Sequence, residues 1–399
     1  MPTTDYATLL AELAQADQLR TRRVVDSVQD AALDIDGRRY VAFASNDYLG
    51  LANHPNVVAA AHRALDRYGV GAAASHLITG HMTPHHQLEL ALADFMRLPK
   101  ALFFPSGYAA NIGILTALAG RGDTIFSDQL NHACLIDGAR LSRATCQRYA
   151  HGDIEALRQL LEASGPGRKV IATDAVFSMD GDIAPLPQLL QLAEEFNALL
   201  VVDDAHGFGV LGEDGRGTLS HFHLLSHPAA ERIIYMATLG KAAGVYGAFV
   251  AGSEAVIEWL LQSARTYIFT TATPPMIAAA LQASLAVLAH DHERRAHLHS
   301  MIALFTQSLK LKNAHLLPSQ TAIQPIVIGD NSRTLQWAEA LRERGFWVPA
   351  IRPPTVPIAS SRLRVSLSAA HDAADVMDLI VALTDLDAGL DFPMGSNRV

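Results

Sequence analysis

Cysteine is scarce in this sequence. Only Cys134 and Cys146 occur among 399 residues, which is too few for a disulfide framework and leaves no cysteine pair at metal-site spacing. Such low cysteine use is typical of proteins from a reducing compartment. We therefore expect both thiols to be packing residues, and we expect no bound metal.

Positive charge is also in short supply. Lys and Arg total 31 against 40 Asp and Glu, so the formal net charge is -9, and the chain has no dense basic run. This balance excludes the electrostatic surface with which proteins bind nucleic acids, so we expect no nucleic-acid partner.

Long uninterrupted hydrophobic runs are missing as well. The two uncharged stretches, residues 101–120 and 266–289, are broken by prolines and polar side chains, so they predict buried core rather than membrane spans. Residues 1–23 are typical of an amphipathic helix and lack the apolar segment of a secretory signal. We expect a cytoplasmic protein with no membrane partner.

What is abundant is core-forming sequence. Hydrophobic residues make up 50% and charged residues 18%, a balance typical of a compact globular protein. Up to about residue 290, short apolar runs alternate with helix-length segments, which favours an α/β domain with a mainly parallel sheet covered on both faces. The runs are residues 101–104, 124–126, 170–173, 198–203, 233–236 and 247–251.

The pattern changes after about residue 290. Apolar runs at 322–328, 346–350 and 363–367 then accompany helical segments at 332–344 and from residue 371, a pattern typical of a small α+β domain. We predict three parts: an N-terminal helix and short strand segment at 1–45, a large α/β domain at 46–290, and a small α+β domain at 291–399.

The most informative motif follows the apolar run at 198–203. Asp203, Asp204 and His206 stand at the end of this predicted strand, where open α/β sheets bind ligands. The next residues match the dinucleotide pattern G-x-G-x-x-G at 207–212, but 213–217 favour a turn instead of the helix that a pyrophosphate needs. A metal site is disfavoured because no second ligand cluster is evident. An ordinary polar strand end remains an alternative.

A single lysine, Lys241, lies in a glycine-punctuated apolar loop after the run at 233–236. It is either a solvated side chain or an amine whose deprotonation is eased by desolvation, as Schiff-base chemistry requires. The loop is not a P-loop, because Ala242 stands where Ser or Thr is needed.

A strand-to-helix turn at 105–108 can accept a phosphate. Ser106 and Gly107 follow the run at 101–104 and open a predicted helix, whose free N–H groups and dipole favour an anion. Tyr108, in the same turn, could lie against a planar ring. By itself the turn is also a common structural feature.

Together these elements suit one cofactor. Pyridoxal phosphate needs an anion-binding helix start, a carboxylate for its pyridine nitrogen and a lysine for its aldehyde, and the sequence offers each of them. The combination is far more specific than any of its parts.

The motifs also carry a family resemblance. The chain resembles the α-oxoamine synthases, a branch of the fold-type I pyridoxal phosphate enzymes, over nearly its whole length. The resemblance implies a large domain with a mostly parallel seven-stranded sheet between helices, a smaller α+β C-terminal domain, and a homodimer with sites at the subunit interface. The matching segments are residues 45–50, 106–111, 131–133, 176–182, 203–207, 238–241 and 352–357.

The resemblance implies a role for each site residue. Lys241 would hold the cofactor and remove the α-proton of the amino acid, and Asp203 would pair with the pyridine nitrogen. His206 would bond the ring hydroxyl with Ser178 close by, and His132 would stack on the ring and help polarise the acyl carbonyl. The remaining implied contacts are Gly107, Tyr108 and Thr238 for the phosphate, Thr270 and Thr271 for the neighbouring subunit's phosphate, Arg352 and Asn46 for the amino-acid carboxylate, and Arg20 and Thr355 for the acyl substrate.

The implied reaction is a decarboxylative condensation of an amino acid with an acyl thioester. Segments 352–357 and 323–333 are most similar to the biotin-pathway branch, which joins L-alanine to a pimeloyl thioester on coenzyme A or acyl carrier protein. The alternatives are sister activities, with glycine and acetyl-, succinyl- or longer acyl-CoA, or serine and palmitoyl-CoA, and a nicotinamide-dependent oxidoreductase. A binding protein without catalysis fits poorly, since Lys241, Asp203 and His206 are all present.

Some positions depart from the family pattern. Residues 69–76 are rich in alanine, and Ala242 and Ala243 follow the lysine where a glycine is common. Both changes leave the chemistry intact and bear on the acyl-chain preference. The other histidines, among them His85, His86, His221 and His223, are expected to be surface or helix-face residues rather than ligands.

Overall fold

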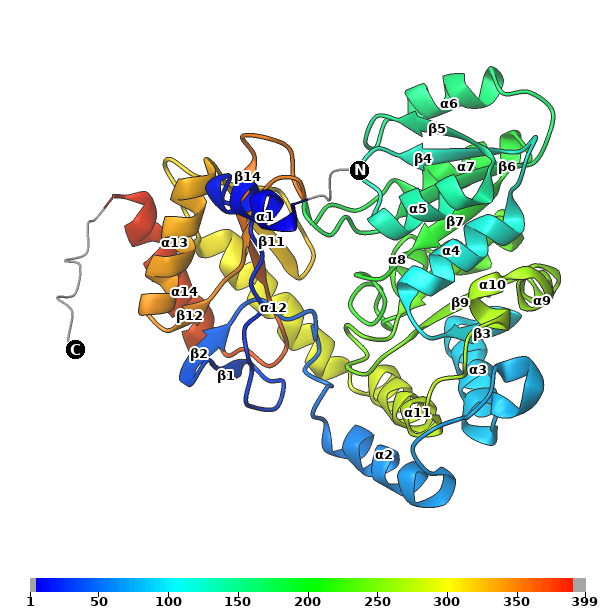
Figure 1. Ribbon diagram of the computed structural model, residues 1–399, viewed down its shortest axis with the longest axis horizontal. Helices are drawn as coiled ribbons and strands as arrows, with labels where there is room; N and C mark the ends of the chain where they lie inside the picture. Colours follow the sequence, from blue (N-terminus) through cyan, green and yellow to red (C-terminus); the bar gives the residue numbers. More distant parts are fainter. Residues whose placement is uncertain (1–4, 390–399) are drawn as a thin grey trace. The chain divides into compact units, whose positions relative to one another are not determined.

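A computed structural model describes residues 5–389 of the chain (Figure 1). The chain forms two compact units. Unit 1 comprises Met1–Ser45, Met179–Gly181 and His297–Val399, and unit 2 comprises Asn46–Ser178 and Asp182–Ala296. The N-terminal segment thus groups with the C-terminal part of the chain, and the second division falls a few residues after the predicted position 290.

A seven-stranded sheet forms the centre of unit 2. Its strand order is β3-β9-β8-β7-β6-β4-β5; β9 runs antiparallel to its two neighbours and the other pairs are parallel. The prediction of a mostly parallel seven-stranded sheet is therefore confirmed. The strands are β3 (Lys100–Phe104), β4 (Thr124–Asp128), β5 (Thr145–Tyr149), β6 (Lys169–Asp174), β7 (Leu199–Asp203), β8 (Ile233–Thr238) and β9 (Ala248–Gly252).

Strand β5 is the one that the apolar runs did not predict. It lies at the edge of the sheet and pairs only with β4, so most of its side chains stay partly or fully exposed and its sequence is polar. Cys146 lies on this strand and is exposed, so the expectation that it packs in the core is wrong, whereas Cys134 is buried.

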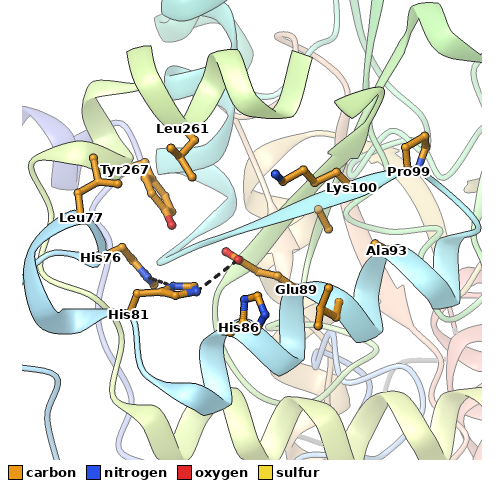
Figure 2. Close-up of a pocket in the computed structure, with 12 residues that line it drawn as sticks. His76, Leu77, His81, His86, Glu89, Ala93, Pro99, Lys100, Leu261 and Tyr267 are labelled. Carbon is orange, nitrogen blue, oxygen red and sulfur yellow. Dashed lines mark hydrogen bonds and ion pairs between the residues drawn. The ribbon is translucent and has the colours of Figure 1, made fainter. Parts of the chain in front are cut away.

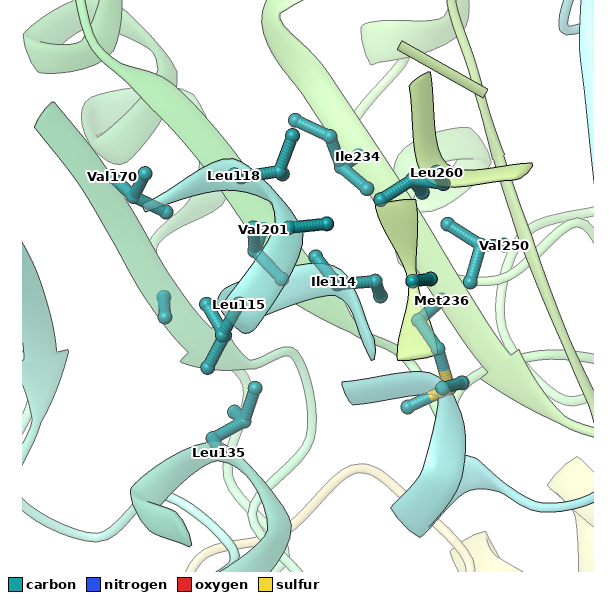
Figure 3. Close-up of a cluster of buried hydrophobic side chains, with 14 of the residues drawn as sticks. Ile114, Leu115, Leu118, Leu135, Val170, Val201, Ile234, Met236, Val250 and Leu260 are labelled. Carbon is teal, nitrogen blue, oxygen red and sulfur yellow. The ribbon is translucent and has the colours of Figure 1, made fainter. Parts of the chain in front are cut away.

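Helices surround this sheet. Among them, α4 (Gly107–Leu118) is buried on nearly all sides because it packs on the strands with Ile114, Leu115 and Leu118 (Figure 3). Truncating one such leucine to alanine costs about 2–5 kcal/mol. The other helices are α2 (Pro55–Tyr68), α3 (Thr83–Met96), α5 (Ala133–Ser142), α6 (Ile154–Glu162), α7 (Leu186–Glu195), α8 (Thr218–His221), α9 (Glu254–Ser263), α10 (Arg265–Ile268), α11 (Pro275–His290) and α12 (His292–Ser308), the last of which continues into unit 1.

Short helical turns complete unit 2. A π-helical turn spans His76–Gly80, and two 3-10 turns span Leu224–Ser226 and Pro228–Arg232. None of the helices in the described part of the chain has the length and apolarity that a membrane crossing requires.

Unit 1 contains two small sheets. One joins β1 (Ala32–Ile35), β2 (Arg38–Ala42) and β12 (Phe346–Trp347); the other has the order β10-β11-β14-β13 and is antiparallel. The expected single strand at 346–350 is wrong, because its two ends are separate strands in different sheets. The remaining elements are α1 (Tyr6–Gln15), β10 (His315–Leu316), β11 (Ile323–Gly329), α13 (Asn331–Glu343), β13 (Ala350–Ile351), β14 (Ser361–Ser366) and α14 (Ala373–Asp387).

Candidate active site

Polar side chains gather at the carboxyl ends of the central strands of unit 2. Asp174 ends β6 and Asp203 ends β7, and the two are paired in register. Both carboxyl groups are buried, and burial raises the pKa of each above its ordinary value. Parallel strands end at the same sheet edge, so this edge concentrates side chains from several distant segments.

Asp203 is held by hydrogen bonds, and the charge of Lys241 lowers its pKa against the larger effect of burial. It is 3% exposed, its Oδ2 accepts a hydrogen bond from Asn111 Nδ2 at 2.6 Å, and its Oδ1 accepts one from the Ala205 N–H at 3.0 Å. Among the described residues, no ion pair joins it to an arginine or lysine. A buried carboxylate of this kind is stabilised when a cation binds next to it.

Lys241 begins a chain of hydrogen bonds. Its Nζ lies 2.7 Å from His206 Nε2, His206 Nδ1 lies 2.6 Å from the Tyr48 hydroxyl, and that hydroxyl donates to Asn46 Oδ1 at 3.0 Å. One arrangement satisfies all three contacts: Lys241 donates to Nε2, Nδ1–H donates to Tyr48, and Tyr48 donates to Asn46. The chain fixes the position of the amine and leaves His206 able to accept its proton.

His132 is the N-cap residue of α5. Its Nδ1 accepts a hydrogen bond from the Cys134 N–H at 3.3 Å, and its own N–H donates to Asp174 Oδ2 at 2.5 Å. Desolvation by the surrounding protein lowers the pKa of the imidazole; Asp203 opposes this shift and Lys241 adds to it. His132 therefore stays neutral near pH 7 while remaining exposed.

The first turn of α4 faces β8. Ser106 caps this helix by accepting a hydrogen bond from the Ala109 N–H at 3.1 Å. A Cβ on Gly107 would lie 3.8 Å from the Cβ of Thr238, so the helix start and this hydroxyl are neighbours. Tyr108 is 46% exposed in the same turn, and its hydroxyl bonds to Asp137. A helix N-terminus next to a hydroxyl is suited to a phosphate group.

Two further predicted residues lie in a different part of unit 2. Thr270 and Thr271 follow α10, and a β-bridge joins Thr271 to Ser75. The Ala272 N–H also donates to the Ala74 carbonyl at 2.9 Å, so this segment lies beside the loop at residues 74–75. Ser178 lies half-buried in the loop closed by the β-bridge between Val176 and Ile183.

The predicted substrate residues Arg20, Arg352 and Thr355 belong to unit 1. Arg352 Nη1 donates a hydrogen bond to the carbonyl oxygen of Asp17, and the Thr355 N–H donates to the Arg352 carbonyl at 3.0 Å. Within unit 1, therefore, Arg352 contacts the segment that carries Arg20.

Sequence reasoning did not assign several of these contacts. The sequence shows Asn111 and Tyr48 only as parts of matching segments, and no motif includes Asp174. The position of Asp174 directly after the run at 170–173 repeats that of Asp203 after 198–202, and this parallel could have revealed it. No sequence signal links Asn111 to Asp203 or Tyr48 to His206.

A second group of histidines lines a separate cavity of about 350 Å³ in unit 2 (Figure 2). His76 Nδ1 lies 3.0 Å from His81 Nδ1, and His81 Nε2 lies 3.8 Å from Glu89 Oε2. Burial raises the pKa of Glu89 to about 7 and lowers that of His76 to about 3. Among the described residues, no group of three or more His, Cys, Asp or Glu side chains is arranged to hold a metal ion.

His85, close to this cavity, lies on helix α3, as predicted, and is fully buried. Its Nδ1 accepts from the Met82 N–H and its Nε2 contacts the Thr273 carbonyl, so both ring nitrogens serve the local fold. His86, His221 and His223 are exposed.

The chain matches a known protein family over most of its length. The family model for aminotransferase class I and II matches residues 38–383. An 8-amino-7-oxononanoate synthase 1 from Polaromonas sp. strain JS666 is 56% identical over 386 residues, which cover 96% of this chain and 95% of that protein. The chain therefore belongs to the aminotransferase class I and II family, and within it to the 8-amino-7-oxononanoate synthases.

Two solved structures are similar along most of the chain. The crystal structure of 8-amino-7-oxononanoate synthase from Francisella tularensis is 32% identical with a TM-score of 0.73, and the match covers 88% of this chain and 98% of that one. A serine palmitoyltransferase from S. paucimobilis, solved with pyridoxal phosphate and myriocin bound, is 28% identical with a TM-score of 0.90, covering 97% and 98%.

The family also settles the dinucleotide alternative. Residues 204–217, which contain the glycine pattern, form turns, and the next helix begins only at Thr218. The helix N-terminus that a pyrophosphate needs is missing from this turn.

Proposed function

We propose that this chain carries 8-amino-7-oxononanoate synthase activity. In that reaction L-alanine condenses with a pimeloyl thioester, with loss of carbon dioxide and of the free thiol. The observation that carries the proposal is the Lys241 amine, held 2.7 Å from His206 at the sheet edge where Asp203 is buried, in a chain 56% identical to such a synthase.

The residues at this edge fit pyridoxal phosphate. Asp203 is a buried carboxylate oriented by Asn111, which suits a protonated pyridine nitrogen, and the start of α4 beside Thr238 suits a phosphate. Lys241 supplies the amine that an aldehyde needs. When bound, pyridoxal phosphate supplies an electron sink that stabilises negative charge on the α-carbon of the amino acid.

Lys241 would have two tasks. Its Nζ would hold the aldehyde carbon of the cofactor and, once released by the incoming amino acid, would accept the α-proton. The contact with His206 Nε2 keeps the amine in place and provides an acceptor for one of its protons. A lysine free in solution would lack both advantages.

Asp203 and His132 would also contact the bound cofactor. The Asn111 bond to Asp203 orients the carboxylate toward its proposed pyridine partner and keeps the charge in one place. His132 would lie against the cofactor ring and, because its Nδ1 accepts the Cys134 N–H, would carry its proton on Nε2. That proton is available for a hydrogen bond to the acyl carbonyl.

The other predicted contacts belong to the same proposal. His206 and Ser178 would bond the ring hydroxyl, and Gly107, Tyr108 and Thr238 would bind the phosphate. Arg352 and Asn46 would bind the amino-acid carboxylate, and Arg20 and Thr355 the acyl group. We further propose a cytoplasmic homodimer in which Thr270 and Thr271 reach the partner's phosphate, with coenzyme A or acyl carrier protein as the thiol.

Release of carbon dioxide and of free thiol tests the proposal. The protein loaded with pyridoxal phosphate is given pimeloyl-CoA with L-alanine, glycine with acetyl- or succinyl-CoA, and L-serine with palmitoyl-CoA, with Lys241→Ala as the blank. The serine arm is included because the serine palmitoyltransferase has the higher TM-score, 0.90 against 0.73. We expect turnover with the first pair only; turnover with another pair alone would overturn the assignment of substrates.

A further inference from the structure

A histidine outside the proposed catalytic set lies between two carboxylates. His151, in the turn after β5, has Nδ1 at 3.1 Å from Asp128 Oδ1 and Nε2 at 2.8 Å from Asp182 Oδ2. Its ring meets the ring of Phe177 edge-on, with centroids 4.3 Å apart. His151 therefore joins three segments that are distant in the sequence.

The geometry determines the protonation state of this ring. A carboxylate can only accept a hydrogen bond, so each ring nitrogen that faces one must carry a proton. Hydrogen bonds to Asp128 and then to Asp182 raise the pKa of His151 to about 10, against a smaller opposing effect of burial. In the described part of the chain, Asp128 and Asp182 are the charged groups that act on the ring, so it remains an imidazolium throughout the neutral range.

The first carboxylate organises the turn that leads to His132. Asp128, 2% exposed at the end of β4, accepts hydrogen bonds from the Leu130 N–H at 2.8 Å and the Gly152 N–H at 2.9 Å. The turn continues through Asn131, whose Nδ2 donates to the Ala172 carbonyl at 2.7 Å. The position of His132 thus depends on a turn built around the Asp128 carboxylate.

The second carboxylate belongs to the loop that carries Ser178. The Asp182 carbonyl accepts the Phe177 N–H at 3.0 Å, and the flanking residues Val176 and Ile183 form a β-bridge. Since the Asp182 side chain is bound by His151, this loop is tied to the β4 side of the sheet edge. His132 and Ser178 stand on the two segments that the imidazolium joins.

We propose that His151 is a positioning residue for the cofactor site: the hydrogen bonds of its two ring nitrogens tie the turn that carries His132 to the loop that carries Ser178. The proposal rests on the function proposed above, because it takes these two residues as cofactor contacts. It does not give His151 any contact with substrate or with the reacting atoms.

The substitution His151→Gln would break the link between Asp128 and Asp182. The amide of His151→Gln could donate to one carboxylate, but its oxygen would face the other and its positive charge would be gone. In Asp182→Asn, the amide oxygen can still accept the Nε2 proton, so the tie is kept. His62→Gln changes an exposed histidine on α2 and serves as the matched control.

Binding of pyridoxal phosphate is the first readout, followed by the visible spectrum of the loaded protein and the split between kcat and KM. For His151→Gln we expect a dissociation constant about tenfold higher, a changed visible band and a lower kcat with little change in the KM of the thioester. Asp182→Asn should stay within about threefold of wild type, and His62→Gln should equal it. Wild-type cofactor binding, spectrum and kcat in His151→Gln would overturn the proposal.

A second measurement does not depend on a folded variant. In wild-type protein labelled with ¹⁵N-histidine, the ring nitrogens of His151 should both be protonated from pH 6 to about pH 9. A neutral His151 at pH 8 would also overturn the proposal. Failure of the proposed function is distinguishable, because a wild type that binds pyridoxal phosphate but turns over no thioester still allows the binding and spectral comparison.

Discussion

Two of the histidine groups in unit 2 differ greatly in chemical capacity. At the sheet edge, His206 connects the Lys241 amine to Tyr48 and lies near a buried carboxylate and a helix start. In the cavity of Figure 2, His76 is hydrogen-bonded to His81 and Glu89 lies 3.8 Å from His81, but among the described residues no lysine amine is hydrogen-bonded to either imidazole. Hydrogen-bonded imidazoles therefore form a candidate active site at the sheet edge, where a lysine amine and a buried carboxylate accompany them, and not in the cavity.

Removing the amine should have the largest effect. Lys241→Ala leaves the sheet edge intact but removes the group that would hold the cofactor and accept the α-proton, so we expect a loss of turnover of about 10³-fold or more. The visible band of the bound cofactor should disappear as well. Carbon dioxide release and absorbance measure the two effects, and a variant that retains both would remove the basis of the proposed function.

Removing the charge of Asp203 should have the second-largest effect on turnover. Asp203→Asn keeps the shape and the Asn111 neighbour but loses the charge that would stabilise a protonated pyridine nitrogen, so we expect kcat to fall about 10²-fold or more. Its neighbour Asp204 is a matched control: burial raises its pKa to about 7, and it bonds the Thr218 N–H and the Tyr235 hydroxyl. Asp204→Asn should reduce kcat far less, and equal losses in the two variants would contradict the assignment.

The hydrogen-bond chain beyond His206 should contribute less. Tyr48→Phe removes the hydroxyl that lies 2.6 Å from His206 Nδ1 but keeps the ring. Loss of one hydrogen bond in a buried network is worth about 1 kcal/mol, so we expect kcat to fall about fivefold to tenfold with a shifted pH profile. A pH profile identical to that of wild type would show that this hydroxyl does not tune the pair formed by His206 and Lys241.

The group formed by His76, His81 and Glu89 in the cavity should affect the stability of the folded protein and not turnover. The folded-state pKa of Glu89 is about 7, above its ordinary 4.5, so the folded state binds more protons between these values and stability falls as the pH rises through this range. Each pKa unit corresponds to about 1.4 kcal/mol. Glu89→Gln keeps an oxygen that accepts the Phe103 N–H. Because glutamine does not titrate, this variant should not lose stability as the pH rises, and its Tm at pH 8 should exceed that of wild type.

The control for this variant is activity. Carbon dioxide release by Glu89→Gln should equal that of the wild type at pH 8, because none of the residues that line the cavity belongs to the Lys241 group. A large loss of turnover would show instead that the two histidine groups are coupled.

Much of the fold follows from local sequence patterns. Central strands such as β7 are continuous apolar runs because both of their faces are covered by helices, and such runs are visible in the sequence. Edge strand β5 has no such signal, since water reaches most of its side chains. Likewise, nothing local shows that Phe346–Trp347 pairs with β2 while Ala350–Ile351 pairs with β14, because pairing depends on partners far along the chain.

The site residues also divide into those that a local sequence pattern reveals and those that it does not. The residue types that the chemistry requires, a lysine in a glycine-punctuated loop, an aspartate after a buried strand and a helix start after another, could be identified from the sequence because each has a local pattern. Their partners could not, since Asn111 approaches Asp203, and Tyr48 approaches His206, only through the packing of separate elements. The burial of His85 and the two carboxylates that keep His151 charged also arise only when those elements pack together.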